Sequence, residues 1–245
     1  MANLTEKWTE IEHLPEWDEE FYDVYTAKKF GKWVMLKTLK PELKENPEFQ
    51  AMLEREFEVR YNLAHPHIIM INDLEEVPGL GLCIITDDVY GDSLAKLIAD
   101  KKVTPAIINK LTHDLVSAID YLQTNHVVHK PLRPETVIFT ENIQNLKLID
   151  VGFDQKHALA PTDVADDIRA FGRVLNLALD ACPELADAPK LRLIAERAEG
   201  PLPYSTVQQL QLAISGASDR RIYLALITFL TLTVAILSII LILHP

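Results

Sequence analysis

The stretch VVHKPLRPETVIFTENIQNLKLIDVGFD, residues 127–154, decides the fold of this chain. It holds two short apolar runs, typical of strands, on either side of a polar loop. Residues 104–125, just before it, carry apolar side chains on one face at helical spacing, with Thr104 and Pro105 suited to the first turn. Three more helices are predicted after it, at residues 164–180, 188–198 and 205–214. The second half of the chain is therefore mostly helical.

The first half predicts strands. FYDVYTAKKFGKWVMLKTLK, residues 21–40, alternates apolar and polar side chains around a Phe-Gly turn and indicates a hairpin. Residues 47–64 indicate a helix with a proline near its start. Two strand-like runs and a short helix follow, at His67–Leu74, Leu80–Asp87 and residues 93–100. This order favours an α+β domain of two lobes joined near residue 88.

Six segments in this order resemble protein kinases. VVHKPLRPETVIF (127–139) resembles the catalytic loop of that family, and LKLIDVGFD (146–154) resembles the segment with its metal-binding aspartate. The other four resemble the lysine strand, the helix whose glutamate pairs with that lysine, the hinge and the central large-lobe helix, at residues 34–37, 53–69, 84–94 and 166–175. The resemblance implies a bilobal protein-kinase-like fold with a small β-rich N-lobe, a helical C-lobe and a short activation segment.

The resemblance also implies a nucleotide site. Lys37 would reach the phosphates, Glu56 would hold Lys37, and Asp150 would bind the metal. Asp87 and Val89 stand in the hinge. These five residues would make the nucleotide site if there is one.

Two departures weaken the nucleotide site. WDEEFYD, residues 17–23, stands where the family has its glycine-rich loop; it has no glycine and four carboxylates, which repel phosphate. Met35 stands where the family has a small alanine over the adenine, and its flexible side chain could fill the slot. We therefore expect no cofactor, with ATP and Mg²⁺ binding only if the domain is an active kinase.

The catalytic loop departs further. The family's catalytic aspartate falls on Pro131, which cannot accept a proton, so no catalytic residue is expected. His129 and the charge at Arg133 are kept, but Thr136 replaces a metal-binding asparagine. An active enzyme would need a substitute base, and Glu135 and Asp154 are the candidates. The segment after Gly152 is too short to hold a peptide substrate, and Arg60 replaces an apolar residue between the lobes.

Structural roles compete with each of these functional ones. Lys37 and Glu56 could form an ion pair that only joins helix to sheet. Asp150 could bond backbone amides at its own turn, and His129 could be a core histidine. The acidic stretch could be a solvated loop, or a partner-docking site formed by Trp17, Asp18, Glu19, Glu20 and Phe21.

Residues 222–243, IYLALITFLTLTVAILSIILIL, predict a transmembrane helix. They contain no charge, proline or glycine, and about 22 residues at about 1.5 Å each span roughly 33 Å. Arg220 and Arg221 precede this stretch, and the N-terminus has no apolar signal sequence. We therefore expect a single-pass C-terminal anchor with the bulk of the chain in the cytoplasm.

The 245-residue chain has a formal net charge of −12, which disfavours nucleic acid as a partner. Its two cysteines have no metal-site spacing and are interpreted as small buried residues. The expected parts are an N-terminal extension, the N-lobe, the C-lobe, a linker and the membrane helix, at residues 1–20, 21–88, 89–215, 216–221 and 222–243.

The leading interpretation is a membrane-anchored pseudokinase that binds other proteins, which are themselves membrane-associated, as a scaffold or regulatory subunit and does not transfer phosphate. The first alternative is an atypical active Ser/Thr protein kinase that binds ATP through Lys37 and Asp150. The second is a structural subunit that assembles through its transmembrane helix, where Thr228, Thr231, Ala235 and Ser238 share one face.

Overall fold

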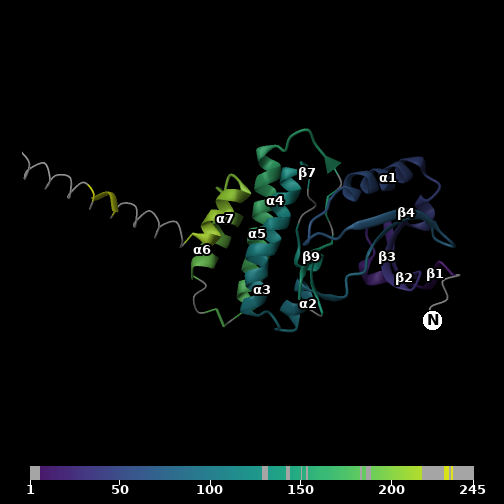
Figure 1. Cartoon of the computed structure of the whole chain (residues 1–245), viewed down its shortest axis with the longest axis horizontal. Helices are drawn as coiled ribbons and strands as arrows, with labels where there is room; N and C mark the ends of the chain where they lie inside the picture. The colour runs from purple at the N-terminus through teal and green to yellow at the C-terminus, as the bar shows by residue number, and fades with distance from the viewer. Residues whose placement is uncertain are drawn as a thin grey trace, which may run out of the picture.

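The computed structural model describes residues 6–128, 132–141, 144–149, 151–152, 154–182, 184–185, 189–216, 229–231 and 233. The expected two lobes are present (Figure 1). A sheet with helix α1 (Pro47–Tyr61) lies at one end, and a bundle of helices forms the other.

The first lobe is built on one antiparallel sheet with the strand order β1-β2-β3-β5-β4. Its strands are β1 (Trp8–His13), β2 (Tyr22–Lys29), β3 (Lys32–Leu39), β4 (Ile71–Val77) and β5 (Gly81–Asp87). The predicted hairpin is confirmed as β2 and β3, and its turn has positive φ at both Phe30 and Gly31. Strand β1 lies within the segment expected as an N-terminal extension. That segment therefore completes the sheet at its edge.

Helix α1 covers one face of this sheet. The Asn46 side chain caps it by accepting from the backbone N–H of Glu48 at 2.9 Å, and Pro47 takes the first helical position. Leu53 packs into the cluster that joins helix and sheet. The same inner face also buries Glu56 and Arg60, so this helix carries charge into the core.

The second lobe is mostly helical, as predicted. Its helices are α2 (Leu94–Ala99), α3 (Pro105–Lys110), the π-helical segment η3 (Leu111–Leu115), α4 (Val116–Thr124), α5 (Pro161–Asp180), α6 (Pro189–Glu199) and α7 (Val207–Ser215). Its short strands are β6 (Gly91–Ser93), β7 (Val127–Val128), β8 (Val137–Thr140), β9 (Leu146–Leu148) and β10 (Asp154–Gln155). Three single-turn 3-10 helices complete the described elements: η1 (Pro15–Trp17), η2 (Pro41–Leu43) and η4 (Pro134–Thr136).

Three further features connect the sequence with the structure. The predicted helix 104–125 is present as α3, η3 and α4, with Thr104 as its N-cap, but its middle is π-helical. Gly172 on α5 allows α6 to approach closely, because a Cβ there would lie 2.7 Å from the backbone nitrogen of Glu199. The two cysteines are buried and free, as interpreted.

Residues 64–69, which follow α1, are bonded to the second lobe. Leu148 on β9 donates its N–H to the carbonyl of His67 at 2.8 Å and accepts from the N–H of Ile69 at 3.0 Å. The hydroxyl of Tyr121 on α4 accepts from the N–H of Ala64 at 3.0 Å. This segment therefore joins the first lobe to the second.

The predicted membrane span at residues 222–243 lies outside the described residues, except for residues 229–231 and 233. Among the residues that are described, no helix combines the length and apolar character needed to cross a bilayer.

Candidate functional site: a cleft between the lobes

A cavity of about 520 Å³ lies between the two lobes. The first lobe contributes Val24, Met35, Lys37 and Arg60 to its wall, and the second contributes Ser93, Lys96, Arg133, Glu135, Thr136 and Ile138. The sequence suggested that Met35 could fill the adenine slot, but an open cavity remains beside it. Met35 and Trp17 line both this cavity and an adjacent one of about 290 Å³.

Lys37 lies on β3 at the inner end of the cleft. The strand register places it opposite Val24 on β2 and Ile84 on β5. Its Nζ donates to Oε1 of Glu56 at 3.0 Å, and the two side chains are 11% and 1% exposed. The ion pair that the sequence suggests is therefore formed, and it is buried.

The electrostatics of the pair keep Glu56 ionised. Burial raises the pKa of Glu56, but the charges of Lys37 and Arg60 outweigh burial and bring the pKa to about 2. Tyr22 lies beside the pair, with its ring 4.1 Å from the Lys37 Nζ. Burial, followed by the charges of Glu56 and Glu19, raises the pKa of Tyr22, so its hydroxyl stays neutral.

Arg60 is a member of this site that the sequence did not identify as one. It was interpreted as a flaw in the apolar packing between the lobes, yet its side chain is 5% exposed and lines the cleft. Its Nη1 donates to the same Oε1 of Glu56 that Lys37 contacts. The spacing of four residues between Glu56 and Arg60 was the available signal, because such residues are neighbours on one helix face.

The acidic loop between β1 and β2 folds over Lys37. Oε1 of Glu19 accepts from the Lys37 Nζ at 2.8 Å, so Lys37 lies between two carboxylates. Trp17, from η1 in the same loop, packs against Ile69, Val89 and Ile138. The loop thus places a carboxylate and an indole ring in the cleft where the resemblance implies phosphate and adenine.

Of the other residues of the predicted docking site, only Asp18 is among the described residues that line the cleft. Glu20 is exposed, and its carbonyl accepts from Lys40 at 3.0 Å. Phe21 packs on Phe49 in the N-lobe, with ring centroids 5.2 Å apart.

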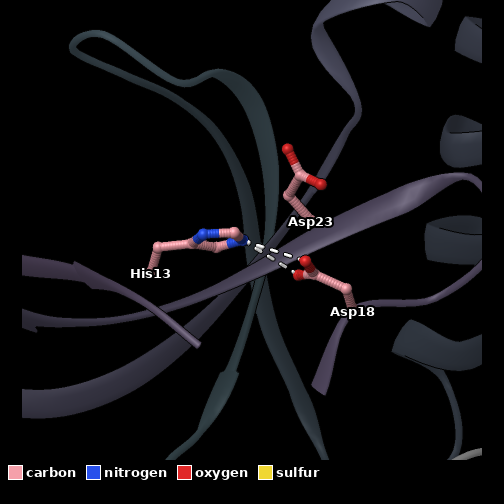
Figure 2. Close-up of side chains that lie close together, drawn as sticks. All are labelled: His13, Asp18 and Asp23. Carbon is pink, nitrogen blue, oxygen red and sulfur yellow. Dashed lines mark hydrogen bonds and ion pairs between the residues drawn. The ribbon is translucent and has the colours of Figure 1, made fainter. Parts of the chain in front are cut away.

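His13, Asp18 and Asp23 form a group at the outer end of the loop whose ligand atoms lie within 4.8 Å of one another (Figure 2). Nε2 of His13 lies 3.0 Å from Oδ1 of Asp18, and that oxygen also accepts from the N–H of Val24 at 2.9 Å. These contacts fasten the loop to β1 and β2. They account for the pairing of His13 with Asp18 without a metal.

The two predicted hinge residues do not line the 520 Å³ cavity. Asp87 instead accepts from Nζ of Lys32 at 2.8 Å and from Nδ2 of Asn72 at 3.0 Å. Burial raises the pKa of Asp87, but these two partners bring it below the usual range. Val89 is buried beside Trp17.

The catalytic-loop residues His129 and Pro131, and the metal candidate Asp150, lie outside the described residues. Glu135 on η4 and Arg133 just before it line the cleft from the second lobe. The hydroxyl of Thr136 donates to the carbonyl of Arg133 at 3.0 Å. Asp154, the other candidate base, is exposed on β10.

The segment between β10 and α5 is short. Strand β10 ends at Gln155 and α5 begins at Pro161. Lys156 and Asp163 form an ion pair of 2.9 Å across this connection, and Asp163 also accepts from the N–H of Ala160. There is little backbone here for a peptide-binding platform, as the sequence predicts.

Comparison with known families identifies this architecture. Residues 20–165, more than half of the chain, match the family described as "Protein kinase domain". The chain belongs to the protein kinase family. The bilobal kinase fold expected from the sequence is confirmed.

Two similar curated proteins are named as serine/threonine kinases. Probable serine/threonine-protein kinase SCO3848 of Streptomyces coelicolor is 30% identical over 136 residues, which are 53% of this chain and 20% of that protein. Serine/threonine-protein kinase PknI of Mycobacterium tuberculosis is 29% identical over 170 residues, which are 65% of this chain and 28% of PknI. The match thus spans between a fifth and a third of these relatives.

Solved structures agree with the fold. The crystal structure of the Mycobacterium tuberculosis PknI kinase domain superposes with a TM-score of 0.64 at 22% sequence identity, covering 86% of this chain and 96% of that domain. This likeness extends the kinase fold to the whole bilobal body of the chain.

Proposed function

We propose that this chain is an atypical serine/threonine protein kinase domain that binds ATP through Lys37 and Asp150. The observation that carries the proposal is the buried Lys37–Glu56 ion pair of 3.0 Å at the wall of a cavity of about 520 Å³. A kinase needs this pair to position the phosphates. The similar proteins named as serine/threonine kinases support the same assignment. The similarity to serine/threonine kinases favours this function over the pseudokinase scaffold that the sequence suggested.

The chain's own residues suit this chemistry in part. ATP would supply the phosphoryl group, and a Mg²⁺ ion held by Asp150 would neutralise phosphate charge. Lys37 would bind phosphate oxygens, with Glu56 fixing its side chain. Glu135 lines the cleft from η4 and would accept the proton of the substrate hydroxyl that Pro131 cannot.

Nucleotide binding is tested by the melting temperature of the full chain with ATP and Mg²⁺. A dissociation constant of about 10 µM would stabilise the chain by roughly 2.7 kcal/mol at 1 mM ATP. Lys37→Met should remove this shift. Lys32→Met is the matched control on the same strand, because its side chain is 70% exposed and pairs with Asp87. If ATP and Mg²⁺ do not change the melting temperature of the wild-type chain, the proposal is contradicted.

Phosphoryl transfer is tested separately with γ-labelled ATP and a serine-containing acceptor. Glu135→Gln should lower the rate of transfer by about 100-fold or more, as expected for a lost general base. Glu141→Gln, on the exposed turn after β8, is the control. No detectable transfer by the wild type would exclude an active kinase, and a loss in Asp154→Asn instead would move the base to that residue.

A second candidate is a pseudokinase that binds another protein. The observation that favours it is the Glu19 carboxylate, which contacts Lys37 at 2.8 Å where a phosphate would bind. Pro131 and the short connection before α5 support the same candidate. This candidate expects neither a melting shift nor transfer in the two assays above. It would make the domain a regulatory subunit of a membrane complex.

We also propose that residues 222–243 anchor the chain in a membrane, with the kinase domain on the side of Arg220 and Arg221. The support is the uncharged apolar run and the basic pair before it. Protease added outside intact cells should leave the domain whole. Digestion before lysis would contradict this orientation.

A further inference from the structure

Arg60 is placed to bind a ligand in the cleft. It lies one turn after Glu56 on α1, lines the cavity and is 5% exposed. Its Nη1 is bonded to Glu56, but its Nε has no hydrogen-bond partner among the described residues. A buried N–H donor without a partner is costly, and the usual explanation is a ligand, ion or water that it meets in another state.

The charges around Arg60 indicate that such a ligand would be an anion. Lys37 and Arg60 both contact Oε1 of Glu56, whose Oε2 has no partner among the described residues. One buried carboxylate therefore serves two buried cations. The second carboxylate near them is Glu19, which comes from a loop and is 29% exposed. If that loop moves away, Lys37 and Arg60 are left to share the single carboxylate of Glu56.

We propose that Arg60 and Lys37 together bind the phosphate groups of a nucleoside di- or triphosphate. This inference rests on the nucleotide function proposed above and deepens it. Kinases bind phosphates through the backbone amides of a glycine-rich loop, and this chain has an acidic loop instead. A guanidinium supplies the missing donors, because its planar fork matches phosphate oxygens and it stays charged at any ordinary pH.

The test measures dissociation constants for adenosine, AMP, ADP, ATP and inorganic pyrophosphate by calorimetry on the full chain in mild detergent. Arg60→Met should weaken ATP and pyrophosphate binding at least tenfold and leave adenosine within twofold. Arg60→Lys, which keeps the charge but loses the fork, should show an intermediate loss that grows with the number of phosphates. Arg55→Met, exposed on the same helix, is the matched control and should change none of these constants.

The outcomes separate this inference from the function on which it rests. ATP binding that is equal in wild type, Arg60→Met and Arg60→Lys overturns the role of Arg60 and leaves the nucleotide function standing. Pyrophosphate binding that depends on Arg60, without ATP binding, supports the phosphate site and overturns the nucleotide function. A wild type that binds neither ligand overturns both. If Arg60→Met does not fold, the dissociation constants of the same ligands for Arg60→Lys test the role of Arg60.

Discussion

Lys37 contacts two carboxylates that differ in burial and in the element that carries them. Glu56 is fully buried on a helix, whereas Glu19 belongs to a loop that is fastened at its outer end by His13 and Asp18. A phosphate that approaches Lys37 competes with Glu19 for the same ammonium group. We therefore expect the acidic loop to lower the affinity for a nucleotide without preventing its binding.

Glu19→Gln should raise the affinity for ATP, because the ligand no longer displaces an ion pair from Lys37. A partly exposed pair contributes about 1 kcal/mol, so the dissociation constant should fall about five- to tenfold. Glu20→Gln, at the exposed neighbouring position, should leave the constant unchanged. Titration calorimetry compares the three chains. Equal affinity in wild type and Glu19→Gln would show that the loop does not compete.

Lys37→Met should reduce the free energy of unfolding by about 1–3 kcal/mol, the cost of a lost buried hydrogen bond. An isolated buried pair would cost more, but Arg60 still holds Glu56 in this variant. For the same reason, adding Glu56→Gln should not restore stability, since it leaves Arg60 buried without a carboxylate. Chemical denaturation measures both changes, with Lys32→Met as the exposed control. A double variant as stable as wild type would contradict this network.

The loop between β1 and β2 is the element on which the nucleotide question depends. Trp17 fixes it by packing on Val89 and Ile138 at the junction of the lobes. A ligand that enters the cavity beside Met35 would contact this indole, since both side chains line its wall. A phosphate at Lys37 would displace Glu19 of the same loop, so we expect the loop to move when a nucleotide binds.

Trp17 emission should report that movement. In a chain carrying Trp8→Phe and Trp33→Phe, saturating ATP should shift the emission of Trp17 to longer wavelength, because the indole becomes exposed to water. The same chain with Lys37→Met should show no shift at that concentration. A bound nucleotide, measured independently, that leaves the emission unchanged would place the ligand away from the loop.

The sequence predicts those elements whose signals are local. The hairpin β2–β3 follows from alternation around Phe30–Gly31, and α1 follows from the cap at Asn46 and Pro47. Strand β1 was missed because its six residues, WTEIEH, are mostly charged or polar, as suits an exposed sheet edge. The π-helical segment η3 was missed because its side chains have ordinary helical spacing.

The site was predictable to the same extent. The Lys37–Glu56 pair follows from two motifs of the family. Glu19 contacts Lys37, 18 positions away, and Trp17 contacts Val89, 72 positions away. The pattern of residues in one sequence carries no signal for such loop contacts. Arg60 was interpreted from the sequence only as an exception to an apolar pattern, although its spacing of four residues from Glu56 was also a signal. Its meaning depended on the carboxylate beside it.

The stability of the whole domain should depend on pH through Asp167. This carboxyl group, on α5, is 9% exposed and accepts from Nε2 of Gln123 at 2.9 Å. Burial raises its pKa to about 6, although the bond from Gln123 opposes the shift. Between about pH 4 and pH 6 the folded chain therefore holds a proton that the unfolded chain has lost.

Asp167 should make its whole contribution to the free energy of unfolding below about pH 4. That contribution should be lost as the pH rises through 6. The loss should total about 3 kcal/mol. The measurement is the difference in unfolding free energy between wild type and Asp167→Asn across pH 4–7, in which the other titrating groups cancel. A difference that does not vary over this range would mean that Asp167 has an ordinary pKa.

The bonds of residues 64–69 to the second lobe make this segment a pivot. Ile69 and His67 are bonded to Leu148, and Ala64 is bonded to Tyr121, so the end of α1 turns with the helical lobe. The backbone hydrogen bonds described for the strands of the sheet, which carries Lys37, stay within the first lobe. If the lobes swing apart while α1 stays with the helical lobe, we expect the gap between Lys37 Nζ and Glu56 Oε1, 3.0 Å in this structure, to widen. That one distance is a gauge of the angle between the lobes.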